Sequence, residues 1–407
     1  MKKILLISQF FYPENFKSND IAFEMTRKGY EVHVLAGIPN YPRGKYYEGY
    51  GLFRKRIESI EGVKIFRSFQ FPRGVNTCSI KLALNYLSFA LCASVWSLFL
   101  LLFNRYEVII IHQTSPITQS LPALCINFFR KTPIILWVLD LWPEAYLSGS
   151  GRKPGLIYKL LNWFTKTIYQ KSTKILISSK AFRASILGQG NFSHKIIYFP
   201  NWSIDFKVKT VDFVLPELPD GFIIMFAGNI GISQDVESIL NLALEFKDDH
   251  RVKFVIIGDG SKRKWLTGQI DSLDLGQVLF LLGQYPLEWM PNFYDKADAM
   301  LLTLSGDFLD LNLYVPAKLQ SYLSSGKPIL GMINGASNEL INEIECGYAV
   351  GAGKYKEMAD VIRNKLLPNI LSLSVLGQNG RLYYENFFTQ HQCIENLCRI
   401  IDDNINS

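Results

Sequence analysis

The sequence predicts an α/β protein made of two doubly wound domains, each built on a mostly parallel sheet. The chain of 407 residues is longer than one ordinary core and fits two domains of about 200 residues each. Short apolar runs alternate with helical patterns almost from end to end, which is typical of parallel sheets with crossover helices. The composition changes between Pro200 and Pro219, and this stretch is the predicted linker.

The predicted strands are short runs rich in branched apolar residues. In the first half they are Lys3–Ser8, Glu31–Ala36, Gly62–Arg67, Glu107–His112, Pro133–Leu139, Thr173–Ile177 and Lys195–Tyr198. In the second half they are Phe222–Phe226, Val252–Ile257, Val278–Leu281, Ala299–Thr303, Pro328–Gly331 and Ala349–Val350. We expect an N-terminal domain over 1–205, a C-terminal domain over 206–385, and a last helix within 386–407 that packs back on the N-terminal domain.

The amino-acid composition limits the kinds of molecule that this protein is expected to bind. The net charge of +7, from 43 basic and 36 acidic residues, suits phosphorylated substrates or an anionic membrane face. Aromatic and basic residues are not interleaved as in single-strand binders, so no nucleic acid partner is expected. The six cysteines form no CxxC pair and have no zinc-like histidine spacing, which predicts a reduced, cytoplasmic compartment and no metal.

The segment 82–103 carries no charged side chain and is long enough to cross a bilayer. Its polar residues and the strand that follows at once favour a buried or interfacial helix, and a membrane span is the alternative. The next predicted helix, 155–171, has leucines on one side and lysines elsewhere. This pattern fits docking on an anionic membrane surface, or equally an ordinary surface helix.

Two loops of the second half are candidate phosphate sites. Val315–Ile329 places Lys318 in the first turn of a helix, where a fixed cation joins unpaired backbone N–H groups. Gly228, Asn229 and Gly231 follow a strand and precede a helix, with Gln234 nearby as a cap or donor.

Further candidates follow other strands. Lys264 lies one turn after Gly258–Gly260, and the loop Gly283, Gln284, Tyr285 can meet a nucleobase, although Tyr285 is equally explained by packing.

In the first half, Glu14 and Asn15 follow the first strand and either face a cleft or form a surface turn. Arg43 follows the second strand and is a candidate to bind the acceptor or a diphosphate, with Asn15 and Glu144 as the other acceptor candidates. Asp140, with Glu144 close behind, directly follows the strand Pro133–Leu139, where a carboxylate acts as a base or orients a hydroxyl, or caps a helix. Ligands of doubly wound domains bind at the carboxyl ends of strands, so we expect the active site between the two domains.

The motifs FYPEN, PNYPRG, DLWPE, PNW, GNIGISQ, GDG, LGQY and VPAKLQSYLSSGKPI occur in this order. Together they resemble glycosyltransferase family 4, closest to the subgroup of bacterial O-antigen, capsule and exopolysaccharide assembly. The resemblance implies a GT-B fold, a nucleotide-sugar donor on the C-terminal domain, no metal or other cofactor, and retention of anomeric configuration.

The resemblance also implies roles. The donor diphosphate would be bound by Gly228–Gln234, Lys264 and Lys318, and the base by Gly283–Tyr285. Glu14, Asn15 and Asp140 would face the reacting sugar and the acceptor. The chain departs from the family where a pair of glutamates is usual, since Leu313 and Ser321 stand there. The contacts to the donor ribose and hexose are therefore expected from Gln320, Ser321 or the backbone amides of Asp310–Tyr314.

The function expected from this resemblance is transfer of a sugar from a nucleotide-sugar, with UDP as the expected nucleotide, to a polyprenyl-diphosphate-linked glycan in bacterial surface polysaccharide (O-antigen or capsule) biosynthesis. The expected place is the cytoplasmic face of the inner membrane. The alternatives are a nucleotide-sugar 2-epimerase and a catalytically inactive membrane-associated scaffold of the same fold. An epimerase needs no acceptor and no apolar helix, and a scaffold need not bind UDP.

Overall fold

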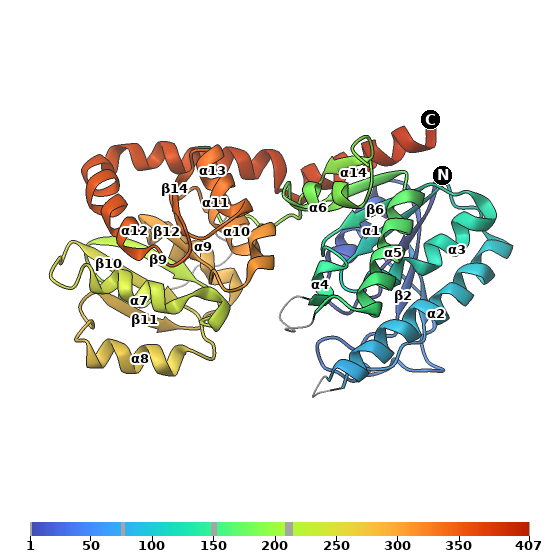
Figure 1. Ribbon diagram of the computed structural model, residues 1–407, viewed down its shortest axis with the longest axis horizontal. Coiled ribbons are helices and arrows are strands. Elements are labelled where there is room, and N and C mark those ends of the chain that lie inside the picture. The colour runs from blue at the N-terminus through green and yellow to red at the C-terminus, as the bar shows by residue number, and fades with distance from the viewer. Residues whose placement is uncertain (1, 75–77, 148–152, 208–214, 407) are drawn as a thin grey trace. The chain divides into compact units, whose positions relative to one another are not determined.

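The computed structural model describes residues 2–74, 78–147, 153–207 and 215–406. The chain divides into two units, one of Met1–Phe199 with Ile394–Ser407 and one of Pro200–Cys393 (Figure 1). We call them the N-terminal and C-terminal units. The sequence analysis placed the boundaries at 205/206 and 385/386. In the structure the second boundary, between Cys393 and Ile394, lies inside a continuous helix, α14 (Gln390–Asn406), where the sequence has no break that could mark it.

The N-terminal unit is built on an eight-stranded sheet of order β3-β4-β2-β1-β5-β6-β7-β8. In this sheet the strands β3 and β4 pair in antiparallel direction. The strands are β1 (Lys3–Ile7), β2 (Glu31–Gly37), β3 (Ile57–Ile60), β4 (Val63–Ser68), β5 (Val108–Gln113), β6 (Ile134–Val138), β7 (Lys174–Ile177) and β8 (Ile196–Tyr198). The edge strand β3 was not predicted, because its side chains are exposed or half-exposed and give no apolar run.

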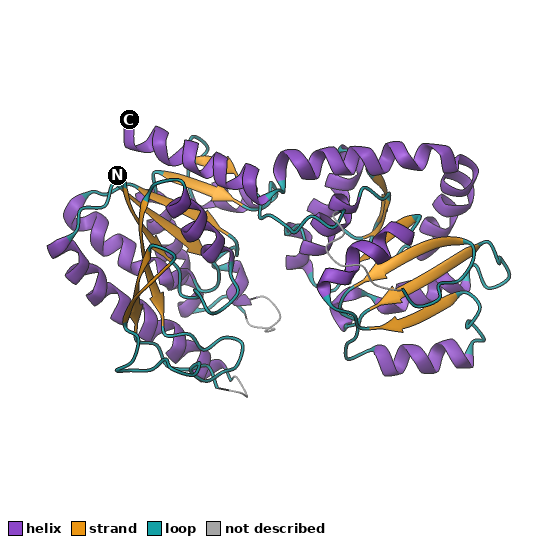
Figure 2. Cartoon of the chain, turned by 180° about the vertical axis from the view of Figure 1, so that it is seen from behind, coloured by secondary structure: helices purple, strands orange, loops and turns teal. Residues whose placement is uncertain are grey.

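Helices cover both faces of this sheet (Figure 2). They are α1 (Lys17–Arg27), α2 (Ser79–Phe103), α3 (Leu121–Arg130), α4 (Glu144–Leu147), α5 (Leu156–Lys171) and α6 (Phe182–Gln189). The last turns of α14 pack here as well: Asp402 accepts hydrogen bonds from Lys2 Nζ and from the Tyr30 hydroxyl, both at 2.8 Å.

Helix α2 is long and apolar enough to cross a membrane by length and composition alone. It packs along its length on α3, β2 and β4, and the side that makes these contacts holds Asn85, Phe89, Ala90, Ala93, Ser97 and Leu100. The opposite side is exposed and almost wholly apolar, with Leu91 62%, Val95 69% and Leu102 75% exposed. One face of α2 is therefore part of the domain core, and the other has no partner in the described chain.

The C-terminal unit is built on a six-stranded sheet of order β11-β10-β9-β12-β13-β14, with every pair parallel. The strands are β9 (Phe222–Ala227), β10 (Val252–Ile257), β11 (Leu279–Gly283), β12 (Ala299–Thr303), β13 (Ile329–Met332) and β14 (Gly347–Val350). The strand order reverses between β9 and β12. Such a reversal opens a crevice at the carboxyl ends of the strands, where doubly wound sheets bind ligands.

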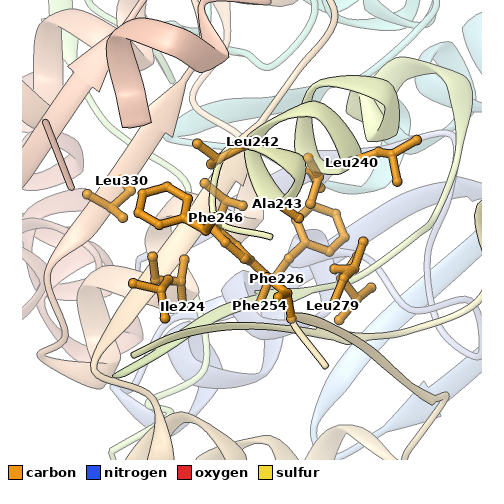
Figure 3. Close-up of a cluster of buried hydrophobic side chains, with 14 of the residues drawn as sticks. Ile224, Phe226, Leu240, Leu242, Ala243, Phe246, Phe254, Leu279 and Leu330 are labelled. Atoms are coloured by element: carbon orange, nitrogen blue, oxygen red, sulfur yellow. The ribbon is translucent and has the colours of Figure 1, made fainter. Parts of the chain in front are cut away.

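Both faces of this sheet are buried under helices. Phe222, Ile224 and Phe226 point into a core shared with α7 (Val236–Leu244) (Figure 3). The alternate residues, such as Met225, pack on the other face against α9 (Met290–Lys296) and α10 (Ala317–Ser325). The remaining helices are α8 (Arg263–Ser272), α11 (Ala336–Glu343), α12 (Tyr355–Val361) and α13 (Leu373–Phe387). The predicted α/β class is confirmed.

Candidate functional site

The loop after β9 is held to the loop after β10 by backbone hydrogen bonds. Gly228 N donates to Ile257 O and Ile230 N donates to Asp259 O, both at 2.8 Å. A Cβ on Gly258 would lie 1.8 Å from Gly228 O, so no other residue fits there without moving the backbone. The two glycine loops therefore form one rigid edge with exposed backbone and almost no side-chain bulk, the kind of surface a phosphate can approach closely.

Lys318 lies across this edge. It is in the first turn of α10, and its ammonium donates to Gln234 Oε1 at 2.5 Å. The same nitrogen lies 4.1 Å from the centre of the Phe226 ring. A Cβ on Gly228 would be 2.3 Å from Lys318 Cε. The absence of a side chain at position 228 thus makes the space in which the lysine lies.

The environment of Lys318 is short of counter-charge. Burial lowers the pKa of its amine to about 7, because the ammonium loses water and gains a neutral amide and an aromatic face in return. An anion bound beside it would favour the charged form. The site therefore favours the binding of a negatively charged ligand.

Helix α10 is fixed to β9 one turn further on. The Tyr322 hydroxyl donates to Ala227 O at 3.1 Å and accepts from Ala227 N at 2.9 Å. Tyr322 is fully buried. Because Tyr322 and Lys318 are four residues apart, they share one face of the helix. The hydrogen bonds of the tyrosine therefore fix the position of Lys318 relative to the glycine loop.

A cavity of about 590 Å³ opens at this edge. It is lined by Phe206, Ala227, Gly228, Asn229, Ile257, Gly258, Asp259, Gln284, Tyr285, Pro286, Leu287, Met290, Tyr294, Ala317, Lys318 and Ser321. Its lining divides into two kinds of group: glycine backbone with an ammonium group, and aromatic and apolar side chains. This division matches a ligand with a charged diphosphate and a flat base.

Six of the residues predicted to bind a donor line this cavity: Gly228, Asn229, Gln284, Tyr285, Lys318 and Ser321. The other five have these positions. Gln234 holds the Lys318 ammonium, and Gly231 lies under the Asn229 amide. Gly283 O accepts from Gly258 N at 2.7 Å. Gln320 is buried and donates to Asn201 O at 3.1 Å, and Lys264 is exposed on α8.

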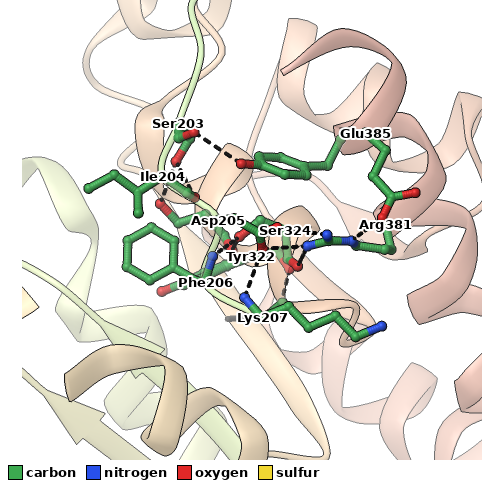
Figure 4. A network of polar contacts seen from close by, with 12 residues as sticks. Ser203, Ile204, Asp205, Phe206, Lys207, Tyr322, Ser324, Arg381 and Glu385 are labelled. Atoms are coloured by element: carbon green, nitrogen blue, oxygen red, sulfur yellow. Dashed lines mark hydrogen bonds and ion pairs between the residues drawn. The ribbon is translucent and has the colours of Figure 1, made fainter. Parts of the chain in front are cut away.

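Phe206, Met290 and Tyr294 are among the lining residues that were not predicted. The ring of Phe206 lies 5.5 Å from that of Tyr294, and Phe206 N donates to Ser324 Oγ at 3.0 Å. Figure 4 shows how the preceding residue is fixed: Asp205 binds Arg381 with both oxygens, at 2.5 and 2.7 Å. This network brings Phe206 to the cavity from 112 positions before Lys318, which no local pattern reveals.

Glu14 in the N-terminal unit is buried, with 1% of its surface exposed. Its oxygens accept hydrogen bonds from the backbone N–H groups of Tyr41 at 2.6 Å, Asn40 at 2.7 Å and Phe11 at 3.2 Å. Burial raises the pKa of this carboxyl to about 7, although these donors lower it. The sequence analysis placed Glu14 facing the reacting sugar. In the structure it joins the loops after β1 and β2, because both loops turn their amides toward it.

The other candidates of this unit follow β1, β2 and β6 in the chain. Asp140 follows β6 and accepts from Ser115 N at 2.7 Å. Asn15 is exposed, as is Arg43, whose guanidinium lies 4.4 Å from the Tyr47 ring centre. Glu144 accepts from the Ser185 hydroxyl. Asp140 alone is at the direct end of a buried strand with part of its side chain open.

Within the described residues, no group of three or more His, Cys, Asp and Glu side chains is placed to hold a metal ion.

Comparisons with known proteins agree with this fold. Residues 208–382 match the family model described as glycosyl transferases group 1. A proposed colanic acid biosynthesis glycosyl transferase, WcaI of Escherichia coli (strain K12), is 25% identical over 320 residues, which cover 74% of this chain and 75% of that protein.

Two solved structures extend the comparison to almost the whole chain. The crystal structure of HepE from Anabaena in complex with UDP has a TM-score of 0.67 at 13% identity and covers 99% of this chain and 100% of that chain. Sucrose-phosphate synthase from Thermosynechococcus elongatus has a TM-score of 0.68 at 13% identity and covers 99% of each chain.

Two doubly wound units with this strand order and these neighbours define the class: the fold is that of the GT-B glycosyltransferases, as predicted. The segment 208–382, which carries the glycine loop, Lys318 and nearly all of the cavity, matches the model of glycosyl transferases group 1, and the curated relative WcaI is described as a glycosyl transferase as well.

Proposed function

We propose that this protein is a metal-independent, retaining glycosyltransferase of family 4. It would transfer a hexosyl or N-acetylhexosaminyl group from a UDP-sugar to a polyprenyl-diphosphate-linked glycan during assembly of a bacterial surface polysaccharide. The observation that carries the proposal is the Lys318 ammonium, which lies over the Gly228 loop in a cavity of about 590 Å³ that is also lined by aromatic side chains. The UDP held by HepE and the colanic acid role named for WcaI support the nucleotide and the pathway class.

The chemistry follows from where charge develops. As the bond between the anomeric carbon and the diphosphate breaks, negative charge grows on the leaving oxygens. The Lys318 ammonium and the amides of the glycine loop are already in place there, and such preorganised groups lower a barrier by several kcal/mol. In the proposed retaining path the acceptor hydroxyl attacks from the same face, and the leaving diphosphate takes its proton. Asp140 would orient the acceptor.

A donor and acceptor screen tests this proposal. Purified protein is incubated with UDP- and GDP-sugars and a short lipid-diphosphate-sugar, and the product is analysed by mass spectrometry and NMR. We expect transfer from at least one UDP-sugar without added metal and in the presence of a chelator, with the anomeric configuration of the donor kept. Inversion, or conversion of the UDP-sugar without an acceptor, would contradict the proposal; the second result would indicate an epimerase.

Attachment to the membrane surface is the second part of the proposal. The exposed side of α2 is a continuous apolar stripe of Ile80, Leu84, Leu87, Leu91, Val95, Leu98 and Leu102. In α5, on the neighbouring part of the unit, Leu156, Ile157, Leu160 and Trp163 are exposed. Since the other side of α2 belongs to the core, we propose that the helix lies in the membrane interface rather than across the bilayer. In this proposal the enzyme acts at the cytoplasmic face of the inner membrane.

Charged residues in the stripe test its role. The double variant Leu91→Glu/Val95→Glu should bind vesicles of phosphatidylglycerol and phosphatidylethanolamine at least tenfold more weakly, since two apolar side chains worth about 1.5–3 kcal/mol each can no longer enter the interface. Flotation with the vesicles measures this. Val375→Glu, an exposed valine of α13, is the matched control and should bind normally. Equal flotation of all three proteins would contradict an interfacial role for α2.

A further inference from the structure

Arg73 follows β4 at the carboxyl end of the N-terminal sheet and is surrounded by aromatic rings. Its guanidinium carbon lies 4.7 Å from the ring centre of Phe10, 5.1 Å from that of Tyr41 and 5.3 Å from that of Tyr86. The rings come from the loop after β1, the loop after β2 and helix α2. Three separate elements therefore fix the plane of one guanidinium group.

The hydrogen-bond donors of the Arg73 guanidinium are only weakly used within the protein. Nε donates to Asn85 Oδ1 at 3.4 Å and Nη2 to the Tyr86 hydroxyl at 3.3 Å, both long and both neutral partners. In the described parts of the chain, no carboxylate lies within the 4.0 Å of an ion pair to Arg73. Arg67, on β4 itself, differs: it is fully buried and its charge is met by Glu58. Arg73 is half-exposed and carries a positive charge without a counter-charge.

The frame that holds Arg73 is itself buried and bonded. Asn85 is fully buried and accepts at Oδ1 from Gln9 Nε2 at 2.9 Å, while its own amide donates to Phe71 O at 2.5 Å. Arg73 N donates to Asn40 Oδ1 at 3.2 Å. A side chain set in this way loses little entropy when it binds, which favours a ligand that needs a fixed fork of donors.

Two further charged side chains, Lys81 and Asp140, lie close to Arg73 or to the rings around it. Lys81 reaches back from the first turns of α2, since a Cβ on Gly74 would lie 3.4 Å from its Nζ. Asp140 is close enough to act on Tyr86, whose pKa is raised by burial and by that carboxylate and lowered by the Arg73 charge. Arg73 and the candidate acceptor-orienting carboxylate therefore lie near Tyr86, and Lys81 lies beside Gly74, the residue that follows Arg73.

We propose that Arg73, with Lys81, forms a subsite for the diphosphate of a prenyl-diphosphate-linked acceptor. A planar guanidinium matches two phosphate oxygens at once, and the helix that contacts Arg73 also carries the apolar stripe beginning at Ile80. An apolar chain and a diphosphate are the two chemical parts of such an acceptor. The inference rests on the proposed function, whose acceptor side it makes specific. A phospholipid headgroup offers related phosphate chemistry, and the experiment separates the two.

The probe is geranyl diphosphate, a soluble prenyl diphosphate, titrated calorimetrically into the full-length protein in saturating UDP so that the Lys318 cavity is filled. Arg73→Met should weaken binding about tenfold or more, since it removes charge-assisted hydrogen bonds. Arg73→Lys, which keeps the charge but loses the fork, should lie between. Arg183→Met, an exposed arginine of α6, should bind as wild type does. Binding of UDP itself should be unchanged in all variants.

Two results would overturn the inference. One is equal affinity of wild type and Arg73→Met for geranyl diphosphate, or equal affinity of wild type for geraniol, which lacks the phosphates. The other is a variant that loses binding to phosphatidylglycerol vesicles but keeps geranyl diphosphate, which would assign Arg73 to a headgroup. Failure of the proposed function is seen separately, as absence of UDP binding by wild type.

Discussion

Replacement of Lys318 by methionine should lower kcat for sugar transfer by about 10²–10³-fold, the loss measured when one preorganised donor to a developing anion is removed. Methionine has nearly the same length, so the space over Gly228 stays filled and the cavity keeps its shape. The acceptor KM should stay close to that of wild type, because no acceptor group is placed in the C-terminal unit. Steady-state kinetics with a UDP-sugar and the lipid-linked acceptor measure both constants.

Stability distinguishes this result from a folding defect. The pKa of Lys318 is lowered by burial. Below pH 10.5, protonation of its amine is therefore less favourable in the folded chain than in the unfolded chain, and this difference lowers the free energy of unfolding. Methionine removes that cost, and the variant should melt at the same temperature as wild type or higher at neutral pH. Lys356→Met, an exposed lysine of α12, is the matched control with unchanged kinetics. Normal turnover of Lys318→Met would remove the basis of the proposed function.

The sequence predicted the parts of the site that are local. Lys318 at the start of a helix, and Gly228 between a strand and a helix, are each readable within about ten residues, because a strand, a glycine turn and a helix N-terminus follow one another in the chain. The bounds of β10 and β12 were predicted to the residue for the same reason. Buried parallel strands are continuous apolar runs, and their ends are marked by glycine or charge.

The contacts between distant segments could not be predicted in this way. Gln234 meets the Lys318 ammonium across 84 positions, and the aromatic rings around Arg73 come from three elements. Glu14 also depends on a contact between distant segments, but here the contact buries a residue that was predicted to face a ligand. A glutamate after a strand can face a ligand or be buried, and the outcome depends on whether a second loop, here at Asn40 and Tyr41, offers its amides. One chain segment does not contain that information.

The affinity for a UDP-sugar should depend on pH through Lys318. In the free protein its amine has a pKa of about 7, lowered by burial, so the site is ammonium below pH 7 and increasingly neutral above it. A bound diphosphate needs the charged form and raises its pKa. Binding therefore takes up a proton above pH 7, and the affinity should be level at low pH and fall by about tenfold per pH unit once the free site is neutral.

Calorimetric titration of a UDP-sugar between pH 6 and 8.5 measures this, and a UDP-sugar is chosen over UDP because its diphosphate has no proton to lose in that range. Repeating the titration in buffers of different ionisation enthalpy counts the protons taken up, which should approach one at pH 8.5. Lys318→Met should bind weakly with no slope. Glu14→Gln removes a carboxyl whose pKa burial also brings to about 7, and this variant should keep the wild-type slope. A slope that disappears in Glu14→Gln and survives in Lys318→Met would move the pH dependence to the N-terminal unit, and the ammonium over the glycine loop would lose its role.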